Sequence, residues 1–215
     1  MKIKWMGLAS FLITSDSRTR IITDPYETGG DLSYGEIRES ADIVTVSHEH
    51  FDHNNVAAVQ GNPQILRKVG EAEVKGIRFK GVGSLHDDVG GKERGKNTIF
   101  WFDVDGVKVC HLGDLGHQLS DEQVSEIGSV DVLLVPVGGI FTIDANVATR
   151  LCNRLKPKMI IPMHFRDGKC RFPIAGVDEF LRGKENVSRL DTSEIELRGE
   201  ELPSVTQIVV PKSAL

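Results

Sequence analysis

Short apolar runs recur along the whole chain, and Gly, Asp, Asn and Pro separate them. Runs of this kind, several of which alternate between apolar and polar positions, are typical of β-strands. Asp105-Gly106 joins two of the runs and indicates a β-hairpin. The pattern predicts strands at residues 2–6, 10–14, 20–23, 43–47, 65–67, 77–82, 98–103, 107–112, 132–135, 159–161 and 205–210.

Helical patterns are fewer, and their capping residues mark where they begin. Ser120 and Asp144 are favourable N-cap residues, and a helical pattern follows each of them. Many strands with interspersed helices, without a repeat or a linker, indicate one layered domain of the α/β or α+β kind. We expect helices at residues 121–127 and 145–155, and shorter ones at 53–59 and 175–182, within a domain that spans 1–215.

The composition narrows the class of protein. The chain has 215 residues, of which 40% are apolar and 27% charged, so it can bury a sizeable core. A disordered, collagen-like or disulfide-scaffold protein is thereby excluded. Acidic residues outnumber basic ones, 31 to 26, and the formal charge is -5. We therefore expect no nucleic-acid partner, because such binding needs a basic surface.

The cysteines and the N-terminal residues indicate the cellular compartment of the protein. Cys110, Cys152 and Cys170 are odd in number and lack metal-knuckle spacing, which favours reduced thiols and a cytoplasmic protein. Residues 2–13 faintly resemble a signal peptide, but their lysines alternate with apolar residues as in a strand. No apolar run approaches the ~20 residues of a membrane-spanning helix, so we expect no membrane association.

The segment His48-Glu49-His50-Phe51-Asp52-His53 carries the strongest chemical signal, and it follows the apolar run at 43–47. Imidazole and carboxylate groups are ligands for zinc, manganese or iron. His48 and His50 point the same way in extended backbone, and a turn at Phe51 would direct Asp52 and His53 to a second ion. Crowded imidazoles and carboxylates desolvate one another, and a bound cation offsets that cost. The alternative is a solvated, histidine-rich turn.

Further ligand-type residues follow other predicted strands. His86, Asp114 and His164 each stand just beyond the carboxyl end of such a strand. Strand ends on one edge of a layered sheet converge, and sites form there in such folds. We therefore expect these three side chains to lie beside the histidine-rich segment.

The order and spacing of His48-x-His50-x-Asp52-His53, His86, Asp114 and His164 resemble those of the metallo-β-lactamase-fold hydrolases. The chain is most similar to the small branch that contains the ascorbate-6-phosphate lactonases, on the evidence of Thr23-Asp24-Pro25-Tyr26, its compact size and the absence of extra domains. The resemblance implies an α+β fold, a four-layer αββα sandwich with the metal ions at one edge of two sheets.

The same resemblance implies the role of each residue. Two divalent metal ions are expected, with zinc preferred and manganese or iron as alternatives. A water or hydroxide between the ions would be the nucleophile, and Asp52 or Asp114 would accept its proton. The first ion would be held by His48, His50 and His86, the second by Asp52, His53 and His164, with Asp114 bridging both.

Two departures from other branches exclude some activities. The flavodiiron branch carries Glu at the position of His50, which argues against reduction of oxygen or nitric oxide. The RNA-processing branches add inserted arms or domains, for which this chain has no room.

Three other residues near these segments have alternative readings. Asp24, before Pro25, is either a turn residue or an acceptor for a ligand imidazole N–H. His111 is favoured as a buried strand histidine rather than a ligand. His117 either reaches the substrate or a metal-bound water, or has a surface or helix-capping role.

Basic residues flank two of the expected ligands. The loop at 89–97 is either a solvated segment or a flap that carries charge toward an anionic substrate. Together, the two groups favour an acidic or phosphorylated substrate. One group follows His86 and the other follows His164: Lys92, Arg94 and Lys96, then Arg166, Lys169 and Arg171.

The sequence therefore predicts a metal-dependent hydrolase whose metal-bound hydroxide attacks a small, anionic ester or lactone. A phosphodiesterase is the alternative enzyme, and a metal-binding or metal-sensing protein without turnover is the alternative from another class. The only expected partner is a small-molecule substrate, and the oligomeric state is not predicted. Ligands that face solvent would favour the enzyme, and a closed ligand shell would favour the sensor.

Overall fold

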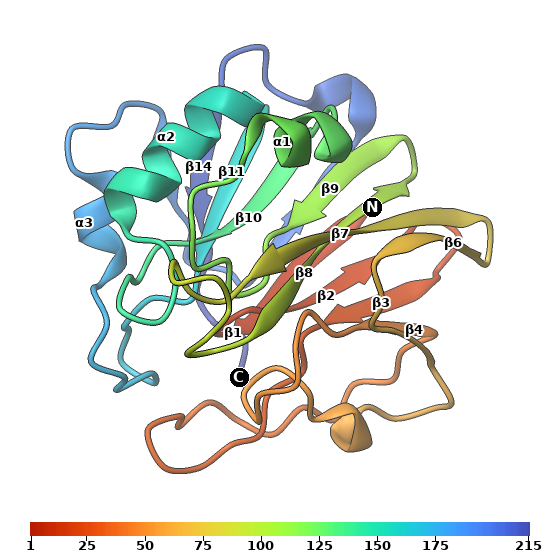
Figure 1. Ribbon diagram of the computed structural model, residues 1–215. Coiled ribbons are helices and arrows are strands. Elements are labelled where there is room, and N and C mark those ends of the chain that lie inside the picture. The colour runs from red at the N-terminus through yellow and green to blue at the C-terminus, as the bar shows by residue number, and fades with distance from the viewer.

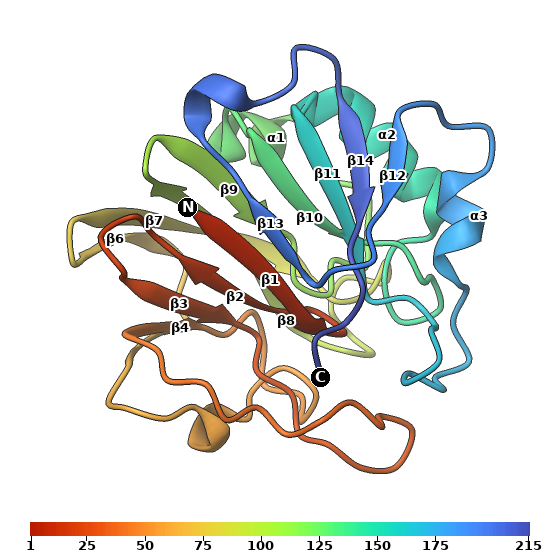
Figure 2. The same cartoon turned by 180° about the vertical axis from the view of Figure 1, so that it is seen from behind.

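Two β-sheets lie face to face in the computed structural model, which describes residues 1–215 (Figure 1). The first sheet has the strand order β13-β1-β2-β3-β4-β5, seen from behind in Figure 2. Its strands are β1 (Lys2–Gly7), β2 (Ser10–Thr14), β3 (Arg20–Thr23), β4 (Ile43–Thr45), β5 (Gln64–Leu66) and β13 (Glu194–Glu196).

The second sheet has the order β12-β14-β11-β10-β9-β8-β7-β6. An antiparallel meander, β6 to β9, continues into a parallel part made of β9, β10, β11, β14 and β12. Its strands are β6 (Gly70–Val74), β7 (Ile77–Leu85), β8 (Lys96–Val104), β9 (Val107–His111), β10 (Val132–Pro136), β11 (Met159–Met163), β12 (Val187–Arg189) and β14 (Gln207–Val210).

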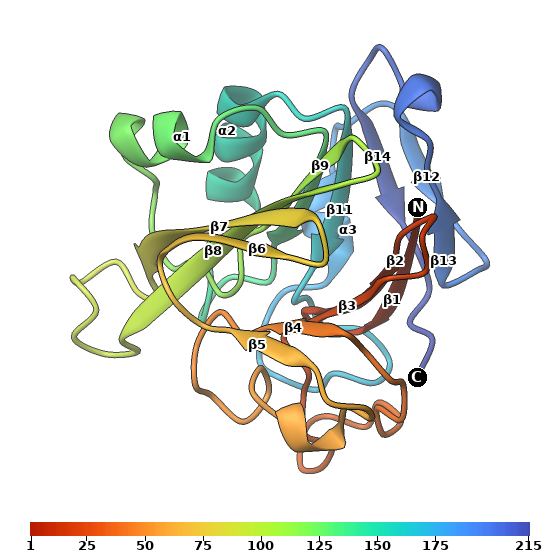
Figure 3. The same cartoon turned by 90° about the vertical axis from the view of Figure 1, so that its right-hand side faces the viewer.

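Helices cover the outer face of the second sheet (Figure 3). They are α1 (Asp121–Ile127), α2 (Ala145–Leu155) and the short α3 (Val177–Leu181). Ser120 accepts a hydrogen bond from the Gln123 backbone N–H, and Asp144 accepts one from that of Val147, as their N-cap positions predict. The bounds predicted for α1 and α2 are confirmed, and α3 is shorter than predicted.

An irregular segment covers the outer face of the first sheet in place of a helix. Tyr26, Leu32 and Tyr34 from this segment are buried against the outward-facing side chains of β1 to β4. The helix predicted at 53–59 is wrong beyond one 3-10 turn, η1 (Val56–Ala58), because the Asn55 backbone N–H donates to Pro25 O instead. The α+β sandwich is confirmed, and its fourth layer is coil with this single turn.

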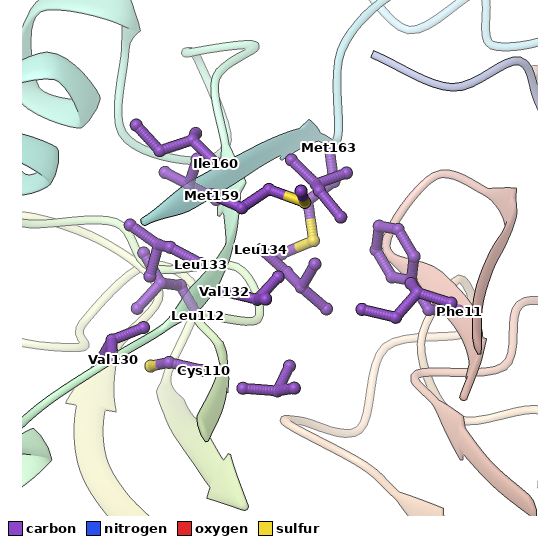
Figure 4. Packing of buried hydrophobic residues seen from close by; sticks show 14 of the residues in the cluster. Phe11, Cys110, Leu112, Val130, Val132, Leu133, Leu134, Met159, Ile160 and Met163 are labelled. Atoms are coloured by element: carbon purple, nitrogen blue, oxygen red, sulfur yellow. The ribbon is translucent and has the colours of Figure 1, made fainter. Parts of the chain in front are cut away.

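The main core lies between the two sheets and beneath the helices. It contains 47 buried residues drawn from both sheets. Figure 4 shows Phe11 of β2 facing Leu134 of β10 and Met163 of β11 across the space between the sheets. Every residue of β10 is buried because a parallel strand is covered on both faces.

The predicted strands are all present, with shifts at their ends. β7 and β8 are longer than predicted, so that His86 directly follows one of them. The strands β6, β12 and β13 were not predicted, because they are short or polar edge strands with little apolar pattern.

None of the helices has the length and the apolar character that a membrane span requires. The three cysteines are free and buried.

Candidate metal centre

Loops at the carboxyl ends of four strands bring the predicted ligands together. His48, His50, Asp52 and His53 follow β4, and Asp114 follows β9. His86 follows β7 and His164 follows β11. All of these side chains are buried except His50, which is exposed to solvent. The convergence expected of them is found, and their role as metal ligands stays a prediction.

The carboxylate of Asp114 lies at the centre of the group. Its Oδ2 atom lies 3.2 Å from His53 Nε2 and 3.2 Å from His164 Nε2. The same oxygen lies 3.4 Å from His86 Nε2 and 4.0 Å from His48 Nε2. One carboxylate therefore faces four imidazoles.

The remaining side chains form two sets around Asp114. In each set the ligand atoms lie within 4.8 Å of one another. The sets are His48, His50 and His86, and Asp52, His53 and His164, and they coincide with the two ligand sets that the sequence resemblance implies. A third group, Asp24, His48 and His53, meets the same distance limit.

Buried polar atoms without partners fit a bound cation. Asp114 Oδ1 and His53 Nε2 are both buried and have no hydrogen-bond partner. Leaving such atoms unpaired costs free energy, and a divalent ion held by these side chains would offset that cost. Imidazole nitrogens with carboxylate oxygens suit zinc, manganese or iron.

Asp24 orients two of the histidines, one by a direct hydrogen bond and one through Ser47. Its Oδ2 accepts hydrogen bonds from His53 Nδ1 at 2.9 Å and from Ser47 Oγ at 2.5 Å. Ser47 Oγ in turn lies 2.9 Å from His48 Nδ1 and, because its own hydrogen is donated to Asp24, accepts a hydrogen bond from that nitrogen. These bonds occupy the Nδ1 atoms of His48 and His53, so that both Nε2 atoms face Asp114. Asp24 thus accepts from an imidazole that is predicted to bind metal, which favours the second of the two roles considered for it.

Substituting Asp24→Asn is expected to weaken zinc binding by about 10–100-fold, the range typical of groups that orient metal ligands. The amide cannot accept from both His53 and Ser47 with the strength of a charged carboxylate. Competition with a chromophoric chelator measures the affinity. The control is Asp191→Asn, which alters an exposed carboxylate paired with Lys212. Equal affinities in the two variants would contradict the role of Asp24.

Burial and neighbouring charges set the protonation of the site. Burial, together with the charge of His53, lowers the pKa of His48 to about 3, and burial lowers the pKa of His86. Burial acts to lower the pKa of His53, but the carboxylates of Asp114 and Asp52 outweigh it and raise that pKa well above its usual value. Without metal, His48 and His86 are therefore neutral ligands at pH 7, and His53 carries a proton.

Metal uptake at pH 7 is expected to release about one proton per chain from His53. The raised pKa of His53 keeps Nε2 protonated through neutral pH, and a metal ion must displace that proton. Apparent affinity should therefore fall as the pH decreases, and the release should vanish only above the raised pKa. Calorimetric titration in buffers of different ionisation enthalpy counts the protons. Zero release at pH 7 would contradict this protonation state.

Two residues that the sequence did not single out position Asp114. Asn97 Oδ1 accepts a hydrogen bond from the Asp114 backbone N–H at 3.0 Å, and Asn97 Nδ2 donates to Leu112 O at 2.9 Å. Gly113 has a positive φ of 55°, and a Cβ there would lie 2.3 Å from Asn97 Oδ1 and 2.5 Å from Ser47 Cβ. Only glycine allows the chain to turn so closely beneath the site. Short polar residues such as Ser47 and Asn97 leave no signal in a single sequence.

Two other histidines lie outside the ligand set. His111 Nε2 lies 2.8 Å from Ala9 O, and its Nδ1 accepts from the Gly113 N–H, as expected of a buried strand histidine. His117 Nε2 accepts from the Leu85 N–H at 3.1 Å, and its Nδ1 bonds to Gln118 O. Backbone groups occupy both nitrogens of His117, which favours the structural role considered for it.

An open cleft of about 530 Å³ exposes part of the site. His48 and His50 line it, together with Arg94 and Lys96 from the first basic group. The second basic group does not line this cleft. In that group, Lys169 Nζ donates to Leu215 O, Arg171 Nη2 donates to Gly30 O, and Arg166 lines a separate cleft.

Comparison with known proteins agrees with this geometry. Residues 2–164 match the family model of a beta-lactamase superfamily domain. A UPF0173 metal-dependent hydrolase of Nanoarchaeum equitans is 31% identical over 215 residues, which cover 86% of this chain and 92% of that protein. Another, from Thermococcus onnurineus, is 29% identical over 77% of this chain and 84% of its own.

A crystal structure from Thermotoga maritima provides the structural comparison. That protein is named as a Zn-dependent hydrolase of the metallo-β-lactamase superfamily. It is 39% identical to this chain, covers 97% of each chain and superposes with a TM-score of 0.81. The similarity therefore extends over both sheets and the helices.

Proposed function

The chain belongs to the metallo-β-lactamase superfamily, among its UPF0173 metal-dependent hydrolases, and from that premise we propose that it cleaves a small ester or lactone at a binuclear metal site. Two ligand sets around one carboxylate support the binuclear site. The name of the Thermotoga maritima relative supports zinc as the metal. The Thr23-Asp24-Pro25-Tyr26 segment supports the proposed similarity to the ascorbate-6-phosphate lactonases, and with it a lactone as substrate.

The residues around Asp114 would have different roles in the proposed reaction. His48, His50 and His86 would hold one ion, Asp52, His53 and His164 the other, and Asp114 would bridge them. Two bound divalent ions supply a hydroxide nucleophile at neutral pH and polarise the scissile carbonyl oxygen.

Asp114 and Asp52 are the proposed acceptors for the proton of the attacking water. Burial acts to raise the pKa of Asp114, but the charges on His164 and His53 outweigh it and hold that pKa well below its usual value. Asp114 is therefore ionised at neutral pH and can accept a hydrogen bond. Asp52 lies 3.7 Å from His53 Nε2, within the same group, and is the second candidate for proton acceptor.

The open cleft is the observation that carries the proposal. His50 is exposed and His48 lines the same cleft, so a small molecule reaches the edge of the first ligand set from solvent. A site that served only structure or sensing would be closed around its metal. Access from solvent is what turnover of a small-molecule substrate requires.

A phosphodiesterase is the second candidate, and the cations of the cleft favour it to a degree. Arg94 and Lys96 stand on the cleft wall, where they would attract a phosphodiester as well as an anionic ester. The substrate panel described next separates the two activities.

The test is hydrolysis by zinc-loaded protein of a panel of lactones, carboxylic esters, thioesters and phosphodiesters. We expect a lactone or a carboxylic ester to give the highest kcat/KM, and we expect that activity to be lost in Asp114→Asn. Preferred cleavage of phosphodiesters would replace the ester proposal by the second candidate. No turnover of any compound by protein containing two metal ions would contradict both.

A further inference from the structure

The cleft beside His48 and His50 carries an excess of positive charge. Arg67, Lys68, Arg94 and Lys96 line it, with Glu49 as the only acidic residue. Arg67 Nη1 lies 2.9 Å from both oxygens of Glu49, so these two charges neutralise each other. The other three cations have no acidic partner within the cleft.

The remaining cations are free to bind a ligand. Lys68 and Lys96 are exposed and form no ion pair. Arg94 lies 3.3 Å from Glu93, but Glu93 is exposed, and exposed pairs of neighbours contribute little. An anion that enters the cleft would therefore displace water rather than an established partner.

Aromatic contacts hold Arg94 at the mouth of the metal centre. Its guanidinium carbon lies 5.4 Å from the centre of the Phe141 ring. Phe141 packs edge-on against Phe172 at 5.9 Å, and Phe172 lies 6.4 Å from the ring of His164. Arg94 therefore contacts Phe141, whose neighbour Phe172 lies beside His164. Arg94 also lines the cleft that opens on His48.

Asp87 fixes the loop that carries Arg94. Its Oδ1 accepts the backbone N–H groups of Val89 at 3.0 Å and Gly91 at 2.6 Å. Its Oδ2 accepts those of Glu93 at 2.9 Å and Arg94 at 2.8 Å. Because Asp87 directly follows His86, the loop is tied to the ligand set, and Arg94 is positioned before any ligand binds.

We propose that Lys68, Arg94 and Lys96 form an anion-binding subsite that selects substrates with a carboxylate or phosphate group near the scissile ester bond. A planar guanidinium pairs with either anion through two parallel hydrogen bonds, and the lysines add charge. The choice of an ester as substrate rests on the proposed function, whereas the binding of an anion by these side chains does not. The anionic group of the substrate would be bound by these three side chains and not by the metal ions.

The kinetic test compares two esters with the same leaving group in zinc-loaded protein. p-Nitrophenyl acetate is neutral, and p-nitrophenyl hemisuccinate carries a carboxylate. In the double variant Arg94→Gln/Lys96→Gln the ratio of kcat/KM, hemisuccinate over acetate, should fall at least about 10-fold, mainly through KM. Lys92→Gln, an exposed cation of the same loop that does not line the cleft, should leave the ratio unchanged. An unchanged ratio in the double variant, or an equal fall in Lys92→Gln, would overturn the subsite.

The binding test does not depend on turnover. Glutarate and inorganic phosphate are titrated calorimetrically into zinc-loaded protein, and Kd should rise at least about 10-fold in the double variant but not in Lys92→Gln. If neither ester is cleaved yet this difference appears, ester hydrolysis fails and the subsite stands. If both esters are cleaved and the variants bind both anions like the parent protein, the subsite fails. Tighter binding of glutarate identifies a carboxylate-bearing substrate, and tighter binding of phosphate a phosphorylated one.

Discussion

Replacing Asp114 by Asn is expected to lower metal occupancy or turnover by at least about 10–100-fold, while the fold is retained. The Oδ2 atom of Asp114 lies within 3.2 to 4.0 Å of four imidazole nitrogens, so both ligand sets depend on its charge. An amide keeps the shape but not the charge, and two cations held across it repel each other more strongly. Metal analysis and ester hydrolysis, measured on the same preparation, quantify both losses.

The fold should survive this substitution because Asp114 is not part of the apolar core. Its backbone N–H remains bonded to Asn97, and the 47-residue core does not include its side chain. Circular dichroism should therefore change little. Asp103→Asn is the matched control, since Asp103 pairs with Arg78 on a neighbouring strand away from the site. Full activity with both metals would remove Asp114 from the centre, and outright unfolding would indicate that the metal mainly supports the fold.

Removing the metal with a chelator is expected to abolish ester or lactone hydrolysis, and adding zinc, manganese or iron is expected to restore it. Without an ion, neither the nucleophile nor the polarised carbonyl is available at neutral pH. The stripped protein should also unfold at a lower temperature, because a metal at 100 times its Kd stabilises the native state by about 2.7 kcal/mol. The measurements are turnover and thermal unfolding before chelation, after chelation and after reconstitution. Turnover that persists in thoroughly stripped protein would contradict a metal-dependent mechanism.

Much of the fold follows from periodicity in the sequence. The central strands are apolar and bounded by turn residues, so β2, β3 and the helices α1 and α2 were predicted with their observed bounds. Edge strands such as β13 have polar, exposed positions and are fixed by pairing with a distant strand. The coil over the first sheet is likewise held by tertiary burial, which local pattern does not reveal.

The sequence predicted those residues of the candidate site whose side chains are of metal-binding types and follow one another in a recognisable order and spacing. Histidines and aspartates just after strands met this condition, and the structure brings them together. Ser47 and Asn97 are common residue types whose roles arise from contacts across 23 and 17 positions. The two basic groups look alike in sequence, yet Arg94 and Lys96 of the first line the cleft, whereas Lys169 and Arg171 of the second bond to backbone oxygens. Only the folded chain distinguishes them.

Anomalous diffraction from crystals of zinc-loaded protein tests the proposed binuclear centre most directly. Two zinc peaks per chain are expected, about 3.5–4 Å apart, with Asp114 between them. One peak should lie beside His48 and His86 and the other beside His53 and His164. A single peak, or peaks away from these residues, would contradict a binuclear centre bridged by Asp114.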